Sequence, residues 1–157
     1  EKTLKISQVL GIKGSNVVSV APDATVHSTL QLFAKQKIGC VMVTNAAGKV
    51  VGLITERDIC NAIAKVGQDA VLAPVQDVMR KKIITCTPDD YLKTVMALMT
   101  VKRTRHVLVM AGKTVEGIIS IGDVVKHRMD EAIKDEESLL DYIEGTGHSV
   151  YSSHLNT

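Results

Sequence analysis

Two short segments of the chain carry side chains that could bind a hydroxylated, anionic ligand. Residues 52–59 read GLITERDI and residues 117–124 read GIISIGDV, a spacing of 65 positions. In each, a hydroxyl residue follows a short aliphatic run and a carboxylate stands three positions later. A hydroxyl at a helix N-cap and a carboxylate in the first turn are both favoured, beside a helix N-terminus that suits anions. The four residues are Thr55, Asp58, Ser120 and Asp123.

The same spacing also has a purely structural interpretation. Ser or Thr followed three residues later by an acidic residue forms a common capping box, which satisfies orphan donors at the start of a helix. A single copy would be explained most simply in this way. Two copies in one chain, each at the end of a matching block, favour a ligand-binding role.

The matching blocks predict two α/β repeats. In each repeat the pattern predicts a brief strand, a Pro-Asp turn, a helix, two strands and a second helix. A short apolar segment leads each repeat, at residues 6–10 and 75–79. The predicted organisation is repeat 1 at 4–66, a linker at 67–74, repeat 2 at 75–130, a helical extension at 131–145 and a disordered tail at 146–157.

The extension continues the last helix from Ile121 to about Glu144, before Gly145 and Gly147. It is strongly acidic, with a narrow apolar stripe that includes Ile133 and Leu140. Such a helix is either solvated and packed on its own domain or a dimerisation element.

Composition excludes several classes of protein. A net charge of +2, without a basic stripe, argues against a nucleic-acid partner. No apolar run approaches the roughly 18 residues of a membrane span, and no signal-peptide pattern opens the chain. We therefore expect a cytoplasmic protein. Cys40, Cys60 and Cys86 are widely spaced in apolar surroundings, which predicts buried reduced thiols rather than disulfides or a zinc site.

At this point the residues resemble a known family, the tandem cystathionine-β-synthase (CBS) domain pair, also called a Bateman module. The resemblance rests on both hydroxyl–carboxylate corners, both Pro-Asp turns and the segment TRHVLV at 104–109, where Leu108 replaces the family's usual proline. It covers roughly residues 4–130. The chain looks like a stand-alone bacterial member, and similar plant relatives are mitochondrial, which would place a plant protein in the matrix.

The resemblance implies an α/β (α+β) fold of two pseudo-symmetric β-α-β-β-α repeats packed sheet to sheet, and a homodimer formed through the repeats. It also implies a regulatory sensor that binds adenine nucleotides and acts on a separate, unidentified effector protein. We expect AMP as ligand, with ATP, ADP and NAD(H) as alternatives. A nucleotide-independent interaction scaffold is the competing interpretation.

The resemblance also implies roles for particular residues. The carboxylates Asp58 and Asp123 would bind ribose hydroxyls, and Thr55 and Ser120 would hold ribose or phosphate. The adenine pocket would comprise Val18, Val20, Ile84, Thr85, Thr87, Pro88 and Val107.

Phosphate also requires cations or backbone donors. The second repeat offers Arg103, Arg105 and His106 before its strand, where the first repeat retains only Lys37. Arg57 could reach a phosphate across the pseudo-two-fold axis. We therefore expect the main nucleotide cleft at Ser120 and Asp123, and a weaker or less anionic cleft at Thr55 and Asp58.

Catalysis is not expected. The chain contains no G-x-S-x-G, Walker or H-E-x-x-H motif, and no nucleophile with an adjacent base and orienting group. Each corner aspartate lacks a second carboxylate at ligand spacing, so no metal is expected either.

Overall fold

The computed structural model describes residues 4–152, and the surroundings of side chains for residues 4–145. The chain divides into two compact units, Glu1–Ile119 and Ser120–Thr157. The first unit holds most of both repeats, and the second is dominated by one long helix. The two units are described in turn.

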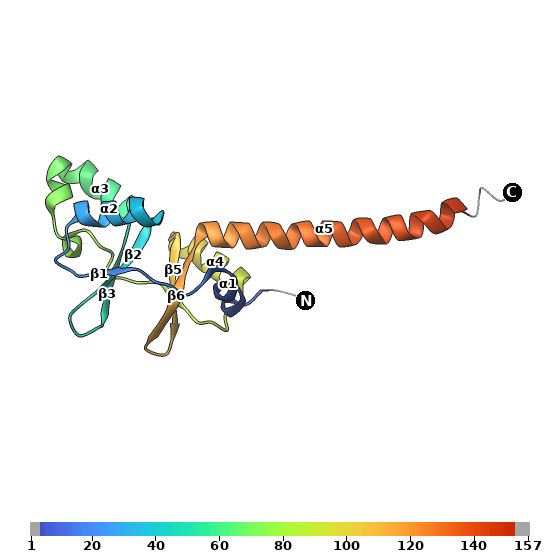
Figure 1. Cartoon of the computed structure of the whole chain (residues 1–157), viewed down its shortest axis with the longest axis horizontal. Helices are drawn as coiled ribbons and strands as arrows, with labels where there is room; N and C mark the ends of the chain where they lie inside the picture. Colours follow the sequence, from blue (N-terminus) through green and yellow to red (C-terminus); the bar gives the residue numbers. More distant parts are fainter. Residues whose placement is uncertain (1–3, 153–157) are drawn as a thin grey trace. The chain divides into compact units, whose positions relative to one another are not determined.

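Two three-stranded sheets form the framework, with strand orders β1-β2-β3 and β4-β5-β6 (Figure 1). The predicted mixed α/β fold with two equivalent repeats is therefore confirmed. The strands are β1 (Ser19–Val20), β2 (Cys40–Thr44), β3 (Val50–Thr55), β4 (Thr85–Cys86), β5 (His106–Ala111) and β6 (Thr114–Ser120). The helices are α1 (Ile6–Lys13), α2 (Val26–Gln36), α3 (Glu56–Val66), α4 (Leu92–Lys102) and α5 (Ile121–Ser152), with 3₁₀ helices η1 (Gly67–Leu72) and η2 (Val75–Asp77).

Each repeat uses its first helix as a crossover. Strand β1 pairs with β2 in parallel, as β4 does with β5, and parallel neighbours cannot be joined by a tight turn. Helices α2 and α4 make these connections. Thr25 caps α2, because its hydroxyl accepts a hydrogen bond from the Ser28 amide at 3.0 Å. Of the two starts that the sequence pattern allows for this helix, near Asp23 or Thr25, the structure has the second.

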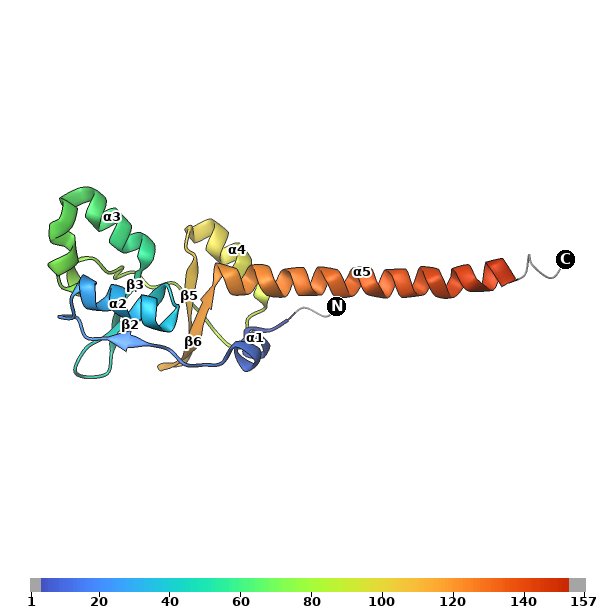
Figure 2. The same ribbon diagram turned by 45° about the horizontal axis from the view of Figure 1, so that its top comes forward.

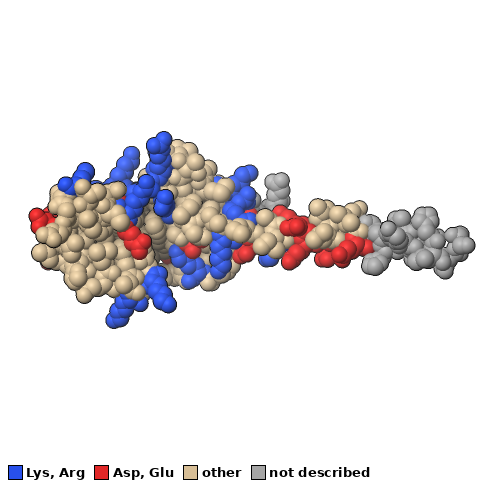
Figure 3. All heavy atoms as spheres, turned by 90° about the horizontal axis from the view of Figure 1, so that it is seen from above, with Lys and Arg blue, Asp and Glu red and all other residues tan. Residues whose placement is uncertain are grey.

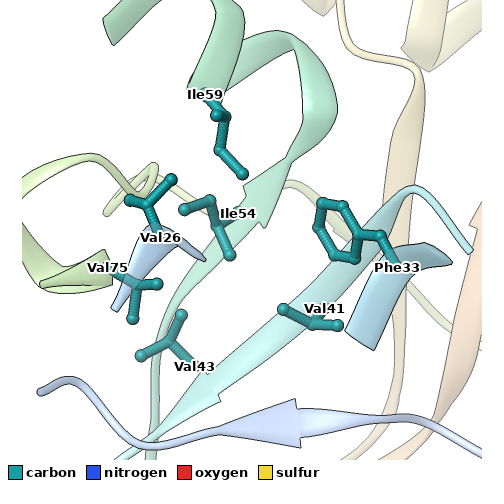
Figure 4. Packing of buried hydrophobic residues seen from close by; sticks show 7 residues of the cluster. All are labelled: Val26, Phe33, Val41, Val43, Ile54, Ile59 and Val75. Atoms are coloured by element: carbon teal, nitrogen blue, oxygen red, sulfur yellow. The ribbon is translucent and has the colours of Figure 1, made fainter. Parts of the chain in front are cut away.

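The core of the first repeat lies between α2, the sheet and α3. Figure 4 shows its aliphatic side chains and the ring of Phe33 converging from these elements. Burying an aliphatic or phenyl side chain of this size contributes about 1.5–3 kcal/mol. The fully or nearly fully buried members are Val26, Phe33, Val41, Val43, Ile54, Ile59 and Val75.

Val75 belongs to this core although it opens the second repeat in the sequence. The chain around it pairs with the start of α2, since the Val75 amide donates to the Ala24 carbonyl at 2.7 Å and the Val26 amide donates to the Ala73 carbonyl at 2.9 Å. The leading segment 75–79 therefore packs on the first repeat, not on the one it precedes.

Helix α1, which leads the first repeat, packs in turn on the second repeat, so the two leading segments are exchanged. It lies beside β6 in both ribbon views (Figures 1 and 2), and an ideal Cβ on Gly117 of β6 would overlap the Leu10 side chain. The amides of Ile6 and Ser7 donate to the carbonyls of Asp90 and Pro88, each at 2.9 Å. The predicted boundaries 4–66 and 75–130 group each leading segment with the repeat that follows it, whereas packing groups it with the other repeat.

The second unit consists mainly of α5, a helix of 32 residues. It continues through Gly145 and Gly147 to Ser152, past the predicted end near Glu144. Glycine lowers helix stability by about 1 kcal/mol but, unlike proline, does not block the helical backbone. Of the predicted disordered tail, residues 146–152 are helical, and 153–157 lie outside the described residues.

Acidic side chains gather along α5, whereas basic side chains are spread over the first unit (Figure 3). Its apolar stripe is half exposed, with 48% of Ile133 and 49% of Leu140 accessible to solvent.

Gly52 allows the second leading segment to dock on β3. An ideal Cβ on Gly52 would lie 2.8 Å from the Arg80 carbonyl oxygen and would overlap the Met79 sulfur. Beside it, the Leu53 amide donates to the Arg80 carbonyl at 3.0 Å, and the Arg80 amide donates to the Leu53 carbonyl at 2.8 Å. A side chain at position 52 would push this segment away.

We predict that Gly52→Ala lowers the free energy of unfolding by about 1–3 kcal/mol, because the added methyl group overlaps backbone that cannot move freely. Gly11→Ala in α1 is the matched control, since no atom lies within 4 Å of its ideal Cβ. That control should be neutral or stabilise by about 0.5–1 kcal/mol. Urea unfolding of both variants checks the prediction, and equal stability would contradict it.

Candidate functional site

A cleft of about 440 Å³ opens in the first unit where the end of β3 meets the approaches to β4 and β5. The first repeat contributes the β3–α3 corner and the second contributes the chain before its two inner strands. Its lining residues are Gly39, Leu53, Thr55, Glu56, Arg57, Arg80, Lys82, Ile83, Ile84, Lys102, Arg103, Thr104, Arg105 and His106.

The lining is strongly basic. It includes six arginine and lysine side chains against a single carboxylate, that of Glu56. Clefts lined by one sign of charge focus the field and attract ions of the opposite sign. Three aliphatic residues, Leu53, Ile83 and Ile84, provide an apolar surface beside the cations. The arrangement therefore suits a ligand with an anionic group and a flat or apolar part.

The turn between α4 and β5 carries two of the cations of the second repeat, Arg103 and Arg105. Arg103 ends α4 in the left-handed region, at φ 51°, as Lys37 does at the end of α2, at φ 54°. The chain then turns into β5, and the Thr104 hydroxyl donates to the His106 carbonyl at 2.9 Å. This turn is nearly fully buried at Thr104, whereas Arg103 and Arg105 are exposed.

At the first corner, Thr55 and Asp58 form a complete capping box. Oδ2 of Asp58 accepts from the Thr55 amide at 3.0 Å and from the Thr55 hydroxyl at 2.9 Å, while the Asp58 amide donates to the Thr55 hydroxyl oxygen at 3.2 Å. The other carboxylate oxygen, Oδ1, accepts from Nε of Arg80 at 2.8 Å. Thr55 lines the cleft, and Asp58 lies behind it with an 8% exposed side chain.

Arg80 was not among the predicted site residues. It directly follows the leading segment 75–79, and its position depends on that segment crossing to the first repeat. Its signal in the sequence is weak, a basic residue immediately after a repeated apolar segment. The exchange of leading segments is what brings it to Asp58.

The second corner repeats the capping box at the start of the second unit. Oδ2 of Asp123 accepts from the Ser120 amide at 2.8 Å and from the Ser120 hydroxyl at 3.0 Å. The Asp123 amide donates back to the Ser120 hydroxyl oxygen at 3.1 Å. Both residues are half-buried. The capping interpretation therefore holds at both corners.

The structure brings together several of the predicted phosphate-binding residues in one cleft of the first unit. The cations of the second repeat, which were expected to serve Ser120 and Asp123, line this cleft with Thr55. The predicted site residues in this lining are Thr55, Arg57, Ile84, Arg103, Arg105 and His106.

The other predicted adenine-pocket residues do not line this cleft. Val18 and Val20 pack against the core of the first repeat, and Val107 is fully buried. Thr85 and Thr87 are exposed, while Pro88 is half-buried. The carbonyl of Pro88 accepts the Ser7 amide of α1, so the exchanged leading segment occupies this side of the second repeat.

The cysteines differ from the expectation of three buried thiols. Cys86 is buried and Cys40 is half-buried, but Cys60, in α3, is exposed. Burial raises the pKa of the Cys40 thiol to about 12, with the Asp58 carboxylate as a further cause and Lys13 and Arg80 opposing it. Burial, followed by the Asp90 carboxylate, raises the pKa of Cys86 to about 12.

Within the described residues, no group of three or more His, Cys, Asp or Glu side chains could hold a metal ion. Between residues 4 and 152, none of the helices combines the length and the apolar character that a membrane crossing requires.

Comparison with known proteins identifies the family. The model of the CBS domain matches residues 10–65 and 75–130, so the chain belongs to the CBS-domain family and contains two such domains. The chain is 32% identical over 148 residues to the CBS domain-containing protein CBSX3, mitochondrial, of Arabidopsis thaliana. That match covers 89% of this chain and 72% of the plant protein.

Solved structures agree with this fold. The CBS-domain containing protein ATU1752 from Agrobacterium tumefaciens is 39% identical, with a TM-score of 0.77 over 79% of this chain and 92% of that one. Two more distant structures contain adenosine compounds. PAE2072 from Pyrobaculum aerophilum, in complex with AMP, is 24% identical, with a TM-score of 0.67 over 76% of this chain and 89% of that one. The CBS domain pair of protein MJ0100, in complex with 5'-methylthioadenosine and S-adenosyl-L-methionine, is 19% identical, with a TM-score of 0.73 over 83% of this chain and 99% of that one.

We predict that a thiol reagent at pH 8 modifies Cys60 first, because this residue is exposed while Cys40 and Cys86 are held as protonated thiols. Mass spectrometry of the labelled native protein checks the order of labelling. Cys60→Ser should abolish the fast phase of labelling, and rapid labelling of Cys40 would contradict the prediction.

The same two buried thiols predict a pH dependence of stability. The folded pKa of Cys40 and Cys86, about 12, exceeds the ordinary 9.0, so the free energy of unfolding is unaffected below pH 9 and falls as the pH rises from 9 towards 12.

Proposed function

We propose that this chain is a regulatory module that binds an adenine nucleotide in the cleft of the first unit and acts on a separate effector protein. The observation that carries the proposal is the cleft lining, in which six cationic side chains stand beside three aliphatic ones. The cations match phosphate and the aliphatic surface matches a purine. The AMP and S-adenosyl compounds named for PAE2072 and MJ0100 support an adenosine-type ligand.

In this proposal Arg57, Arg103 and Arg105 bind the phosphate together with His106, and Ile84 contacts the adenine. Arginine suits this task because its planar fork matches phosphate oxygens bidentately. AMP remains the expected ligand. Lys82 and Lys102, which were not predicted, raise the number of cations and make ADP and ATP equally compatible with the charge of the cleft. The corner of Ser120 and Asp123 would form a second site.

The module would act by binding rather than by catalysis. A nucleotide that contacts residues of both repeats favours the arrangement in which those residues converge, and this preference could be transmitted to a partner. We further propose a homodimer formed through the repeats. Exposed apolar side chains on α3 and α4, such as Val66 at 62% and Val101 at 76%, support such an interface. A location in the cytoplasm, or in the mitochondrial matrix of a plant, completes the proposal.

The interaction scaffold without a nucleotide is the second candidate. It is favoured by the capping boxes, because the hydroxyl and carboxylate of each corner bond to each other. These bonds satisfy the groups that were expected to contact ribose. Under this interpretation the basic cleft would bind no nucleotide, including NAD(H).

We predict that Arg105→Ala weakens AMP binding by about 10-fold or more, since a hydrogen bond to a charged group contributes about 1.5–3 kcal/mol. Lys113→Ala is the control, because this exposed cation does not line the cleft. Isothermal titration of AMP into nucleotide-stripped protein measures both. Equal loss in the two variants would indicate unspecific attraction by the net charge and would contradict the proposed site.

A further inference from the structure

An exposed apolar stripe extends along α5 from Ile121 to Ile143. Large aliphatic side chains recur there every three or four residues, so at 3.6 residues per turn they fall on one face of the helix. Each is between 39% and 58% exposed, and the early ones line a shallow groove. Val124 and His127, which point away from the stripe, are buried instead. The stripe consists of Ile121, Val125, Met129, Ile133, Leu139, Leu140 and Ile143.

The later turns of α5 have no buried face within the part of the chain that the structure describes. Every residue from 132 to 145 is exposed, on all sides of the helix. A helical segment of this length is marginal in water, and most helical stability in proteins comes from packing of an amphipathic face. The apolar side of this segment therefore requires a covering partner.

Charge is distributed unevenly along α5 (Figure 3). Residues 121–129 carry the cations Lys126 and Arg128 and one carboxylate, that of Asp123, whereas residues 130–144 carry seven carboxylates and a single lysine. Two copies of the helix side by side in parallel would bring their acidic segments together, which is unfavourable. The antiparallel orientation brings the basic start of each helix towards the acidic end of the other.

One antiparallel register pairs the charges on both flanks of the stripe. Lys126 and Glu137 lie on one flank, 11 residues or about three turns apart. Arg128 and Asp135 lie on the other flank, 7 residues or about two turns apart. When a two-fold axis relates two antiparallel helices, each flank faces the same flank of the second copy. Both charge pairs have their midpoint between residues 131 and 132, so one axis at that point forms both.

The same axis matches the apolar stripe to itself. It brings Val125 opposite Leu139 of the second copy and places the small side chain of Ala132 where the two helices approach most closely. Glu136 is the one charged residue within the stripe, and a buried carboxylate requires a cationic partner. In this register it comes next to Arg128 of the second copy, which donates to its own Glu131 through Nη1 and has further donors.

We infer that α5 is a self-association element, and that its stripe is covered by α5 of a second copy in antiparallel orientation, centred between residues 131 and 132. This contact is distinct from the homodimer through the repeats, for which α3 and α4 were proposed, and it does not depend on nucleotide binding. The interface is isologous, so each of its charge pairs forms twice.

Disulfide cross-linking of the full chain tests the orientation, with Cys60→Ser as the background because Cys60 is exposed. The double variant Val125→Cys/Leu139→Cys should form disulfide-linked dimers, since the two positions meet across the axis. Each single variant should not, because its own copies lie about 20 Å apart in an antiparallel pair and a disulfide requires Cα atoms within about 7 Å. Asp141→Cys, outside the stripe, is the control and should not cross-link.

Charge reversal tests the register. Lys126→Glu removes two pairs between the copies and creates two like-charge contacts, so it should weaken self-association by about 10-fold at low salt. Glu137→Lys should have the same effect, whereas the double reversal should restore association to within about 2-fold of the wild type. Lys134→Glu is the matched control, because it makes the same charge change on the opposite face of α5. Sedimentation equilibrium measures the dissociation constant of each variant.

Polar substitution of the stripe tests whether it carries the contact. Ile133→Asp combined with Leu140→Asp should halve the mass of the assembly, whether or not the repeats form a further dimer. AMP titration of the same variant keeps this question separate from the proposed nucleotide function.

Three results would overturn the inference. Disulfide-linked dimers of either single cysteine variant would show parallel pairing. An unchanged mass in the stripe variant would show that something other than α5 of a second copy covers the stripe. A monomeric wild-type protein would show that no second copy covers it.

Discussion

The site depends on one backbone contact, the pairing of Arg80 with Leu53 at the end of the exchanged leading segment. Gly52 makes the contact sterically accessible, because any larger residue would overlap the Arg80 carbonyl. The contact joins the segment that opens the second repeat to β3, an edge strand of the first repeat's sheet. Without it, Arg80 would not meet Asp58, and Val75 would leave the core that it completes.

The reciprocal exchange explains why the two repeats differ in their contacts although they follow the same sequence pattern. Segment 75–79 places the Arg80 that follows it beside Asp58 at the first corner, whereas α1 bonds to the carbonyls of Asp90 and Pro88 in the second repeat. The cations that precede β5 then line the same cleft as Thr55. One basic cleft results from two equivalent halves, and its ligand would contact residues of both. A module of this kind can respond to a ligand because the ligand favours one arrangement of the two halves.

Much of the fold could be predicted from sequence, because it depends on local patterns. Thr55 caps a helix as the capping-box pattern predicts, and each repeat has the predicted order of a brief strand, a helix, two strands and a second helix. The repeat spacing, together with the resemblance it supports, gave the family. The end of α5 was predicted too early, since glycine weakens a helix without ending it.

The site was predicted in its residues but not in its geometry. Thr55, Arg57 and Arg105 line one cleft, but no local pattern showed that the first corner would share it with the cations of the second repeat. Pairing across the repeats depends on long-range packing that no local pattern encodes. Arg80 was missed for the same reason. The expected burial of Cys60 was wrong, because apolar neighbours in the sequence do not decide whether a residue of a helix is exposed.

The central claim is that the cleft binds an adenine nucleotide. The most direct measurement is isothermal titration of AMP, ATP and NADH into nucleotide-stripped wild-type protein, with the mass of the complex determined alongside. The account predicts saturable AMP binding at one or two sites per chain, weakened by added salt because cations supply the contact. No binding of any of the three compounds would contradict it, and the interaction scaffold would then be the better description of this protein.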